Sequence, residues 1–242
     1  MKLKTVQATA IKSVFEVLKD IISDVNIVFD KHGVELKTLD TAKVTFIYMF
    51  LDAKNFEVYE CPTRVVAGLN ISNTFKLLKT ISTNDTLEIC VTDYMEIKIE
   101  NTQKKSNTVF RMKLLDINED EYDVENLVFD VITIIPSIGF QKIVREMSTF
   151  SSSVCIRRYD NKLELKCNGD FVDQMTEIEC TDSTEKEYAN EYSLKYINMF
   201  AKSTNISSNL SIQQRDDGPI SFKYYIGNLG EIEFYLAPKT DS

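Results

Sequence analysis

The chain has 242 residues, a hydrophobic fraction of 43% and a formal net charge of −9 at pH 7. This length allows one large domain or two of ordinary size, and the apolar fraction can build a sizeable core, which excludes intrinsic disorder. A phosphate backbone repels an acidic surface, so the total charge argues against nucleic acid unless the basic residues are gathered on one face.

The distribution of apolar residues and cysteines narrows the class of protein further. No apolar run is long enough to span a bilayer, and the N-terminus lacks an apolar signal-peptide core, so we expect a chain that stays inside a cell without a membrane partner. The only histidine is His32. The five cysteines are scattered without a C-x-x-C pair, which argues against zinc and predicts reduced thiols at Cys61, Cys90, Cys155, Cys167 and Cys180.

Motifs for catalysis and for cofactors are missing. The seven glycines form neither a G-x-G-x-x-G nor a P-loop, and no G-x-S-x-G occurs. A stretch that starts at Asp116 resembles the beginning of a calcium loop, but Glu121 stands where the loop needs glycine and Leu127 where it needs a bidentate Glu. We therefore predict no enzyme activity, no metal and no cofactor.

In chain order, four segments share one layout, a short amphipathic helix followed by strands joined by tight turns. The helices are expected over residues 9–23, 72–82, 137–148 and 193–203. The strands that follow them are expected over 26–30 and 34–38, 86–91 and 94–100, 154–158 and 162–167, and 209–213 and 220–226. This layout predicts an α+β protein with the helices packed on one side of antiparallel sheets.

An acidic stretch divides the four segments into two halves. Residues 116–130 (DINEDEYDVENLVFD) hold seven acids and no base, which is typical of an extended, solvated connector. We therefore expect an N-terminal domain over 1–115, a connector over 116–130 and a C-terminal domain over 131–242.

Each predicted helix also carries a pair of basic residues on its polar side, three or seven positions apart, a spacing that keeps both on one helical face. The pairs are Lys12 and Lys19, Lys76 and Lys79, Lys142 and Arg145, and Lys195 and Lys202. A single pair is an ordinary solvated helix face, but the repetition in all four helices predicts one basic face. Without base-reading aromatic residues, such a face would contact phosphates loosely and read no sequence.

Several motifs along the chain resemble the proliferating cell nuclear antigen family, the eukaryotic-type DNA sliding clamps. They are GVELKTLD (33–40), GLNI (68–71), FKLLK (75–79), RMKLLD (111–116), Pro136-Ser137 with Phe140, and FYLAPK (234–239). The resemblance implies the DNA-clamp fold, with two similar domains in each chain and two helix-plus-antiparallel-strand units in each domain. It also implies a homotrimeric ring whose helices line the central hole and whose sheets face outward.

The function that the resemblance implies is that of a processivity factor, which encircles duplex DNA and tethers DNA polymerase and other replication and repair proteins. A clamp loader would be a further partner, and the chain would work in the nucleus, or at a viral replication site if its source is a virus. The alternatives are a clamp-like subunit of a heteromeric checkpoint or replication ring, a monomeric factor held on DNA by charge, and a β-rich enzyme.

The resemblance further implies three sets of site residues. The DNA-facing residues would be Lys12, Lys19, Lys76, Lys79, Lys142, Arg145, Lys195 and Lys202. A pocket for partner peptides of the form Gln-x-x-aliphatic-x-x-aromatic-aromatic would be formed by Leu39, Tyr122, Val124, Phe129, Pro219, Tyr235, Ala237 and Pro238. Subunits would pair through strand edges at 107–113 and 174–180, with Phe110, Met112, Met175 and Ile178 at the interface. Asp160 stands where many relatives carry a lysine that is modified by ubiquitin.

Overall fold

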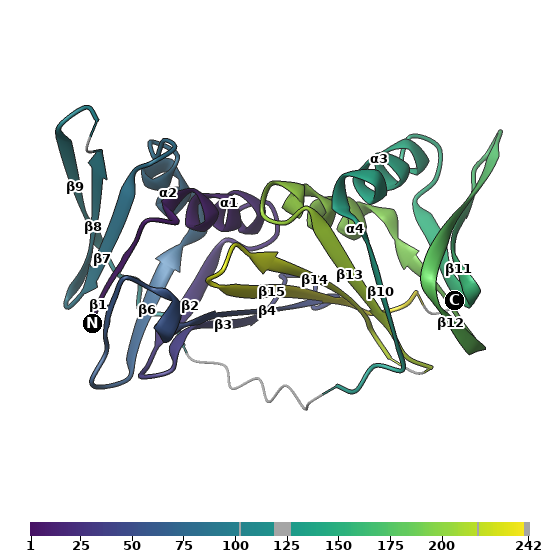
Figure 1. Cartoon of the computed structure of the whole chain (residues 1–242), viewed down its shortest axis with the longest axis horizontal. Helices are drawn as coiled ribbons and strands as arrows, with labels where there is room; N and C mark the ends of the chain where they lie inside the picture. Colours follow the sequence, from purple (N-terminus) through teal and green to yellow (C-terminus); the bar gives the residue numbers. More distant parts are fainter. Residues whose placement is uncertain (102, 119–126, 217, 240–242) are drawn as a thin grey trace. The chain divides into compact units, whose positions relative to one another are not determined.

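Each of the four predicted helices is present in the structure, a computed structural model that describes residues 1–101, 103–118, 127–216 and 218–239 (Figure 1). The helices are α1 (Ala8–Leu18), α2 (Ile71–Leu78), α3 (Ser137–Met147) and α4 (Leu194–Phe200). The chain divides into two units. Unit 1 comprises Met1–Thr41, Ile47–Tyr122 and Tyr225–Ile232, and unit 2 comprises Ala42–Phe46, Asp123–Tyr224 and Glu233–Ser242.

Unit 1 is built from antiparallel strands with two helices. Its strands are β1 (Lys2–Thr5), β2 (Asp24–Phe29), β3 (Gly33–Leu39), most of β4 (Thr45–Asp52), β5 (Val58–Glu60), β6 (Val65–Asn70), β7 (Thr86–Val91), β8 (Tyr94–Asn101) and β9 (Ser106–Lys113). One sheet has the order β5-β1-β7-β8-β9, and a second run has the order β4-β3-β2-β6. The short 3₁₀ helix η1 (Ala53–Asn55) follows β4.

The alternation of apolar residues decides which face of these strands is buried. In β7 and β8, Leu87, Ile89, Ile97 and Ile99 point into the core, and the residues between them are more exposed, as the two-residue period of a strand requires. The helices α1 and α2 pack against each other in this unit. The side chain of Asn70 caps α2 by accepting a 2.9 Å hydrogen bond from the backbone N–H of Asn73.

Unit 2 combines a sheet, a long hairpin and two helices. Its strands are β10 (Val131–Pro136), β11 (Ser153–Asn168), β12 (Asp173–Ser193), β13 (Asn209–Gln214), most of β14 (Ile220–Ile226) and the second half of β15 (Gly230–Leu236). The run β10-β13-β14-β15 is hydrogen-bonded in that order, and β11 pairs with β12. Figure 1 shows α3 and α4 together on one side of these strands. The α+β class with antiparallel sheets is therefore confirmed.

Aromatic side chains fill the core of unit 2. The rings of Phe200 and Phe234 stack with centroids 4.7 Å apart, and Phe222 lies 5.8 Å from Phe200. Tyr224 is fully buried beside Phe234. Burial raises the pKa of the Tyr224 hydroxyl, because the charged phenolate would lose its hydration.

Three of the predicted helices and one pair of predicted strands differ from those observed. The first two helices were expected to continue to residues 23 and 82, but α1 ends at Leu18 and α2 at Leu78, and a turn follows each of them. The fourth helix was expected to continue to residue 203, but α4 ends at Phe200 and the 3₁₀ helix η2 (Ala201–Asn205) follows it. The expected strands 154–158 and 162–167 are one strand, β11, whose pairing with β12 changes register between Arg158 and Lys162. A bulge, rather than a turn, therefore occupies the space between them. Among the described residues, no helix has the length and apolar character needed to cross a membrane.

Candidate functional site

The four basic residues expected on the helices of unit 1 have different environments. Lys76 and Lys79 are exposed at the C-terminal end of α2, and the Lys76 ammonium donates to Asn73 Oδ1 at 3.0 Å. Lys12 is half-buried, and its Nζ donates to the backbone carbonyl of Ile81 at 2.7 Å. The Lys12 ammonium therefore already donates one hydrogen bond inside unit 1.

Lys19 is also half-buried, at the C-terminal cap of α1. Its Nζ lies 4.9 Å from the centroid of the Phe75 ring and 3.6 Å from a carboxylate oxygen of Asp20. These contacts are of the cation–π and surface ion-pair kinds, each worth about 1 kcal/mol or less. Lys19 can exchange them for a contact with a phosphate at small cost.

The four basic residues expected on the helices of unit 2 are exposed. Lys142 and Arg145 lie three positions apart on α3, so they share a face. Lys195 is on α4, with its Nζ 5.6 Å from the ring of Tyr196, and Lys202 is on η2 rather than on α4. The opposite side of α3 is buried through Phe140, Val144 and Met147, so the cations of α3 point away from the core of the unit.

The acidic stretch is described at both of its ends. At the first end, the backbone N–H of Leu115 donates to the carbonyl of Gly68 at 2.8 Å. A Cβ at residue 68 would lie 2.2 Å from the carbonyl oxygen of Leu115, so only glycine permits this close crossing. At the other end, the N–H of Asp130 donates to the carbonyl of Gln214 at 3.0 Å. Tyr122 and Val124, expected in the peptide pocket, lie outside the described residues.

The structure brings together part of the expected pocket around Tyr235. The ring of Phe129 stacks on the ring of Tyr235 with centroids 6.3 Å apart, and the ring of Phe46 lies 5.8 Å from it on a tilted plane. Phe46 and Phe129 are half-buried, whereas Tyr235 is only 8% exposed. The pocket members Leu39, Pro219 and Pro238 are half-buried and Ala237 is exposed.

The hydroxyl of Tyr235 is bound inside unit 2. It donates to the carboxylate of Glu233, and the ammonium of Lys223 lies 2.7 Å from the other oxygen of the same carboxylate. Glu233 is 5% exposed. Because a buried carboxylate needs partners to be tolerated, the lysine and the phenol together keep this acid in place beneath the pocket.

Sequence reasoning missed Phe46 and Glu233. A signal for Phe46 was present, because β4 alternates buried Ile47, Met49 and Leu51 with aromatic residues on its other face. Aromatic side chains on the outward face of a strand often mark a contact surface. Glu233 lies inside an apolar run. The sequence of that run does not indicate that Glu233 binds the side chains of Tyr235 and Lys223.

The strands β9 and β12 are terminal strands of their sheets, so each has one edge that is not paired within the described residues. The strand β9 pairs with β8 only, and β12 pairs with β11 only. Of the expected interface residues, Phe110 and Met112 on β9 and Ile178 on β12 are half-buried, and Met175 on β12 is 59% exposed. These edges coincide with the two segments expected to pair between subunits.

The five cysteines are free thiols, as predicted. Desolvation by burial raises the pKa of all five thiols. Each thiol is therefore held protonated at neutral pH, in the form that reacts slowly.

Comparison with known proteins gives consistent matches over the chain. The model described as "Proliferating cell nuclear antigen, N-terminal domain" matches residues 1–123, and the model described as "Proliferating cell nuclear antigen, C-terminal domain" matches residues 123–239. A protein of Paramecium bursaria Chlorella virus 1, named "Probable DNA polymerase sliding clamp 1", is 33% identical over 250 residues, which cover 98% of this chain and 95% of that relative. The resemblance inferred from the motifs is therefore confirmed.

Proposed function

Since the chain belongs to the proliferating cell nuclear antigen family, we propose that it is a DNA sliding clamp, a processivity factor that encircles duplex DNA. It tethers DNA polymerase and other replication and repair proteins to the duplex and performs no catalysis itself. The observation that carries the proposal is the pair of consecutive family matches, which together cover residues 1–239.

The ring is a homotrimer in which β9 of each copy pairs with β12 of the next. Support comes from the two free edges and from their charges, because β9 carries Arg111 and Lys113, and β12 carries Glu177 and Glu179. A closed cyclic arrangement covers these two edges in every copy, and an uncovered edge otherwise invites uncontrolled pairing.

The basic residues of the helices face the DNA in this ring. The strongest candidates are the exposed cations, Lys76, Lys79, Lys142, Arg145, Lys195 and Lys202. The half-buried Lys12 and Lys19 complete the set. Since the closed ring supplies retention, these contacts only need to be weak enough to let the duplex slide.

The pocket around Tyr235 receives the clamp-binding peptides of partner proteins. Support comes from the contact of the rings of Phe46 and Phe129 with the ring of Tyr235. Ala237 and Pro238 follow Tyr235 in the chain after Leu236. The connector over 116–130 joins the domains 1–115 and 131–242. A clamp loader opens the ring, and the clamp works where DNA is replicated, in a nucleus or at a viral replication site.

The test of the proposal is the solution mass of the purified chain, measured by light scattering after size exclusion at several concentrations. A stable mass of three times the 27.8 kDa chain supports the ring. A monomer at every concentration contradicts the homotrimer, and a trimer that forms only with a second, different chain identifies a heteromeric ring.

A further inference from the structure

The β11–β12 hairpin changes register twice near its middle. Arg158 faces Tyr188, Asp160 faces Thr184, and Lys162 faces Glu179, so β12 carries extra residues on both sides of Thr184. Asp160 has a φ of 43°, in the left-handed region that residues other than glycine rarely adopt. The hairpin therefore has two regular halves, with an irregular junction between them.

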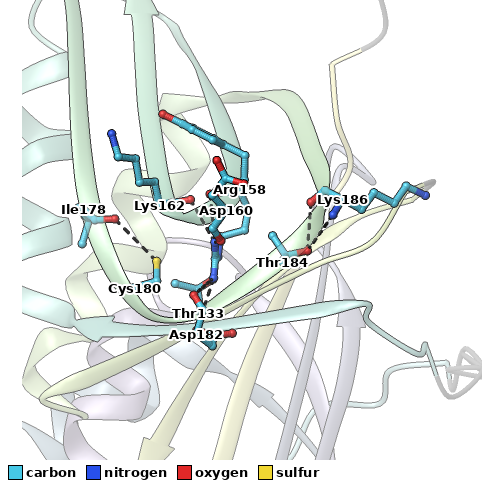
Figure 2. A network of polar contacts seen from close by, with 10 residues as sticks. Thr133, Arg158, Asp160, Lys162, Ile178, Cys180, Asp182, Thr184 and Lys186 are labelled. Atoms are coloured by element: carbon cyan, nitrogen blue, oxygen red, sulfur yellow. Dashed lines mark hydrogen bonds and ion pairs between the residues drawn. The ribbon is translucent and has the colours of Figure 1, made fainter.

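The guanidinium of Arg158 lies at the centre of this junction (Figure 2). Its Nε donates to Thr133 Oγ1 on β10 at 3.1 Å. Its Nη1 donates to three backbone carbonyls of β11, those of Tyr159 and Lys162, both at 3.3 Å, and that of Asp160. Its Nη2 donates to the carbonyl of Asp182 on β12 at 2.8 Å and lies 3.4 Å from the Asp182 carboxylate.

These contacts join three strands through one side chain. Arg158 is 0% exposed, although it carries a full charge. A buried cation is tolerated only when hydrogen bonds replace its hydration, and the planar guanidinium, with five N–H groups, reaches acceptors on β10, β11 and β12 together. The contacts therefore fix the irregular backbone of β11 and β12 relative to β10.

Apart from Arg158 and the pairing with β11, few contacts hold the part of β12 from Asp173 to Glu187 in place. No residue of β12 between Asp173 and Glu187 is buried, whereas Leu163 and Leu165 anchor the facing part of β11 in the core. The position of this part of β12 depends on its pairing with β11 and on polar contacts. Arg158 supplies the buried polar contact, at Asp182.

We propose that Arg158 is a positioning residue for subunit assembly, which sets the path of β12 so that the edge 174–180 meets β9 of a second copy. The inference rests on the proposed ring and deepens it. The guanidinium makes no contact with the second copy and acts through the backbone of the junction. A change at Arg158 therefore weakens the ring without altering any residue at the interface.

The test compares Arg158→Met and Arg158→Lys with the matched control Arg157→Met. Methionine keeps most of the volume and removes every donor, and lysine keeps the charge but not the planar arrangement of donors. Arg157 is the neighbour on the same strand, and its guanidinium binds the Glu187 side chain, with Nε–Oε1 at 2.7 Å and Nη2–Oε2 at 2.8 Å. The control therefore removes an arginine from β11 and keeps every hydrogen bond that Arg158 donates.

Two quantities are measured, the dissociation constant of the trimer by sedimentation equilibrium and the hydrogen exchange of the amides of residues 174–180. For Arg158→Met and Arg158→Lys we expect the dissociation constant to rise by about tenfold or more, with faster exchange at 174–180 and unchanged exchange in the helices. The control is expected to stay within about twofold of the unmodified protein.

A folded Arg158→Met variant with an unchanged dissociation constant and unchanged exchange overturns the proposal. If that variant does not fold, Asp182→Asn decides the matter, because it removes only the carboxylate and keeps the carbonyl contact. Asp182→Asn is expected to shift both quantities in the same direction by a smaller factor, and no shift overturns the proposal. If the unmodified chain is monomeric, the proposed ring is wrong. Hydrogen exchange at 174–180 is then compared between the monomeric variants and the unmodified monomer, and unchanged exchange overturns the role of Arg158 in positioning this edge.

Discussion

The two ends of the Tyr235 side chain have separate roles. The ring lies against Phe46 and Phe129, and the hydroxyl donates to the buried carboxylate of Glu233. Because this hydroxyl is already bonded inside the unit, the proposed pocket would offer a partner an aromatic surface held in a fixed orientation. Such a surface suits the aromatic residues that end a clamp-binding peptide.

We predict that Tyr235→Ala lowers the affinity for a clamp-binding peptide by about 2 kcal/mol or more, as the loss of a central aromatic residue commonly does. The measurement is isothermal titration calorimetry with a synthetic peptide. The matched control is Tyr225→Ala, because Tyr225 is a tyrosine on β14 that is 55% exposed. Equal affinity of the Tyr235→Ala variant and the unmodified chain would remove Tyr235 from the pocket.

At the residue scale, sequence patterns identified side chains but not their partners. The seven-residue spacing placed Lys12 and Lys19 on the polar side of α1, yet Lys12 donates to the carbonyl of Ile81 and Lys19 covers the ring of Phe75. Both partners come from a region about sixty residues away in the chain. A helical period describes one helix, so it carries no information about such contacts.

At the scale of elements, α2 and α3 combine a buried apolar side with exposed cations. Ile71, Thr74 and Leu78 of α2 are buried, and Lys76 and Lys79 are exposed. Cations near the C-terminal end of a helix are also favoured by the helix dipole. These helices can therefore present positive charge at a fixed place within an acidic chain.

We predict that the triple variant Lys76→Ala, Lys142→Ala, Lys79→Ala weakens retention on duplex DNA and leaves the trimer intact. Each lysine that neutralises a phosphate contributes roughly 0.9 to the slope of log K against log salt, so the slope should fall by up to about 3 for each subunit that contacts the DNA. The measurement is DNA binding by fluorescence anisotropy over a range of salt concentrations.

The control for this variant removes three lysines of equal charge that lie outside α1, α2, α3 and α4, namely Lys31, Lys54 and Lys166, all of which are exposed. The control variant should keep the salt dependence of the unmodified chain. An identical loss of DNA affinity in both variants would mean that net charge alone, rather than the basic residues on the helices, governs DNA binding.

The elements themselves were predictable where the apolar pattern was regular. The expected strands 86–91 and 220–226 coincide with β7 and β14, because their buried residues are evenly spaced. The strand β11 was split in the prediction because Asp160 and Asn161 resemble a turn. The full length of β12 was missed because from Asp173 to Glu187 it exposes mostly acidic residues and threonines, which show little apolar alternation.

At the scale of the whole molecule, the acidic charge and the DNA-binding function are compatible. The chain carries −9 overall, but the exposed residues on α2 and α3 include cations, which in the proposed ring would face the duplex. The acids of the strands would then face water. Composition alone argued against nucleic acid, and only the periodicity of the helices together with the family resemblance pointed to it.

The family and the fold class could be predicted from the sequence, because motifs such as RMKLLD and FYLAPK are spread along the chain. The segments assigned to each unit could not. Ala42–Phe46 belongs to unit 2 and Tyr225–Ile232 to unit 1, although both lie in the other half of the sequence. Such exchanges depend on long-range packing, which local patterns do not record.

Encirclement is the central claim, and order-of-addition binding to linear duplex DNA tests it most directly. A closed ring threads onto a free DNA end, so no loader is needed at high protein concentration. If the clamp is added first and both biotinylated ends are then blocked with streptavidin, we predict that it stays bound at a salt concentration that abolishes charge-held binding. If the ends are blocked first, we predict no retention at that salt. Equal retention, or equal loss, in the two orders of addition would contradict encirclement.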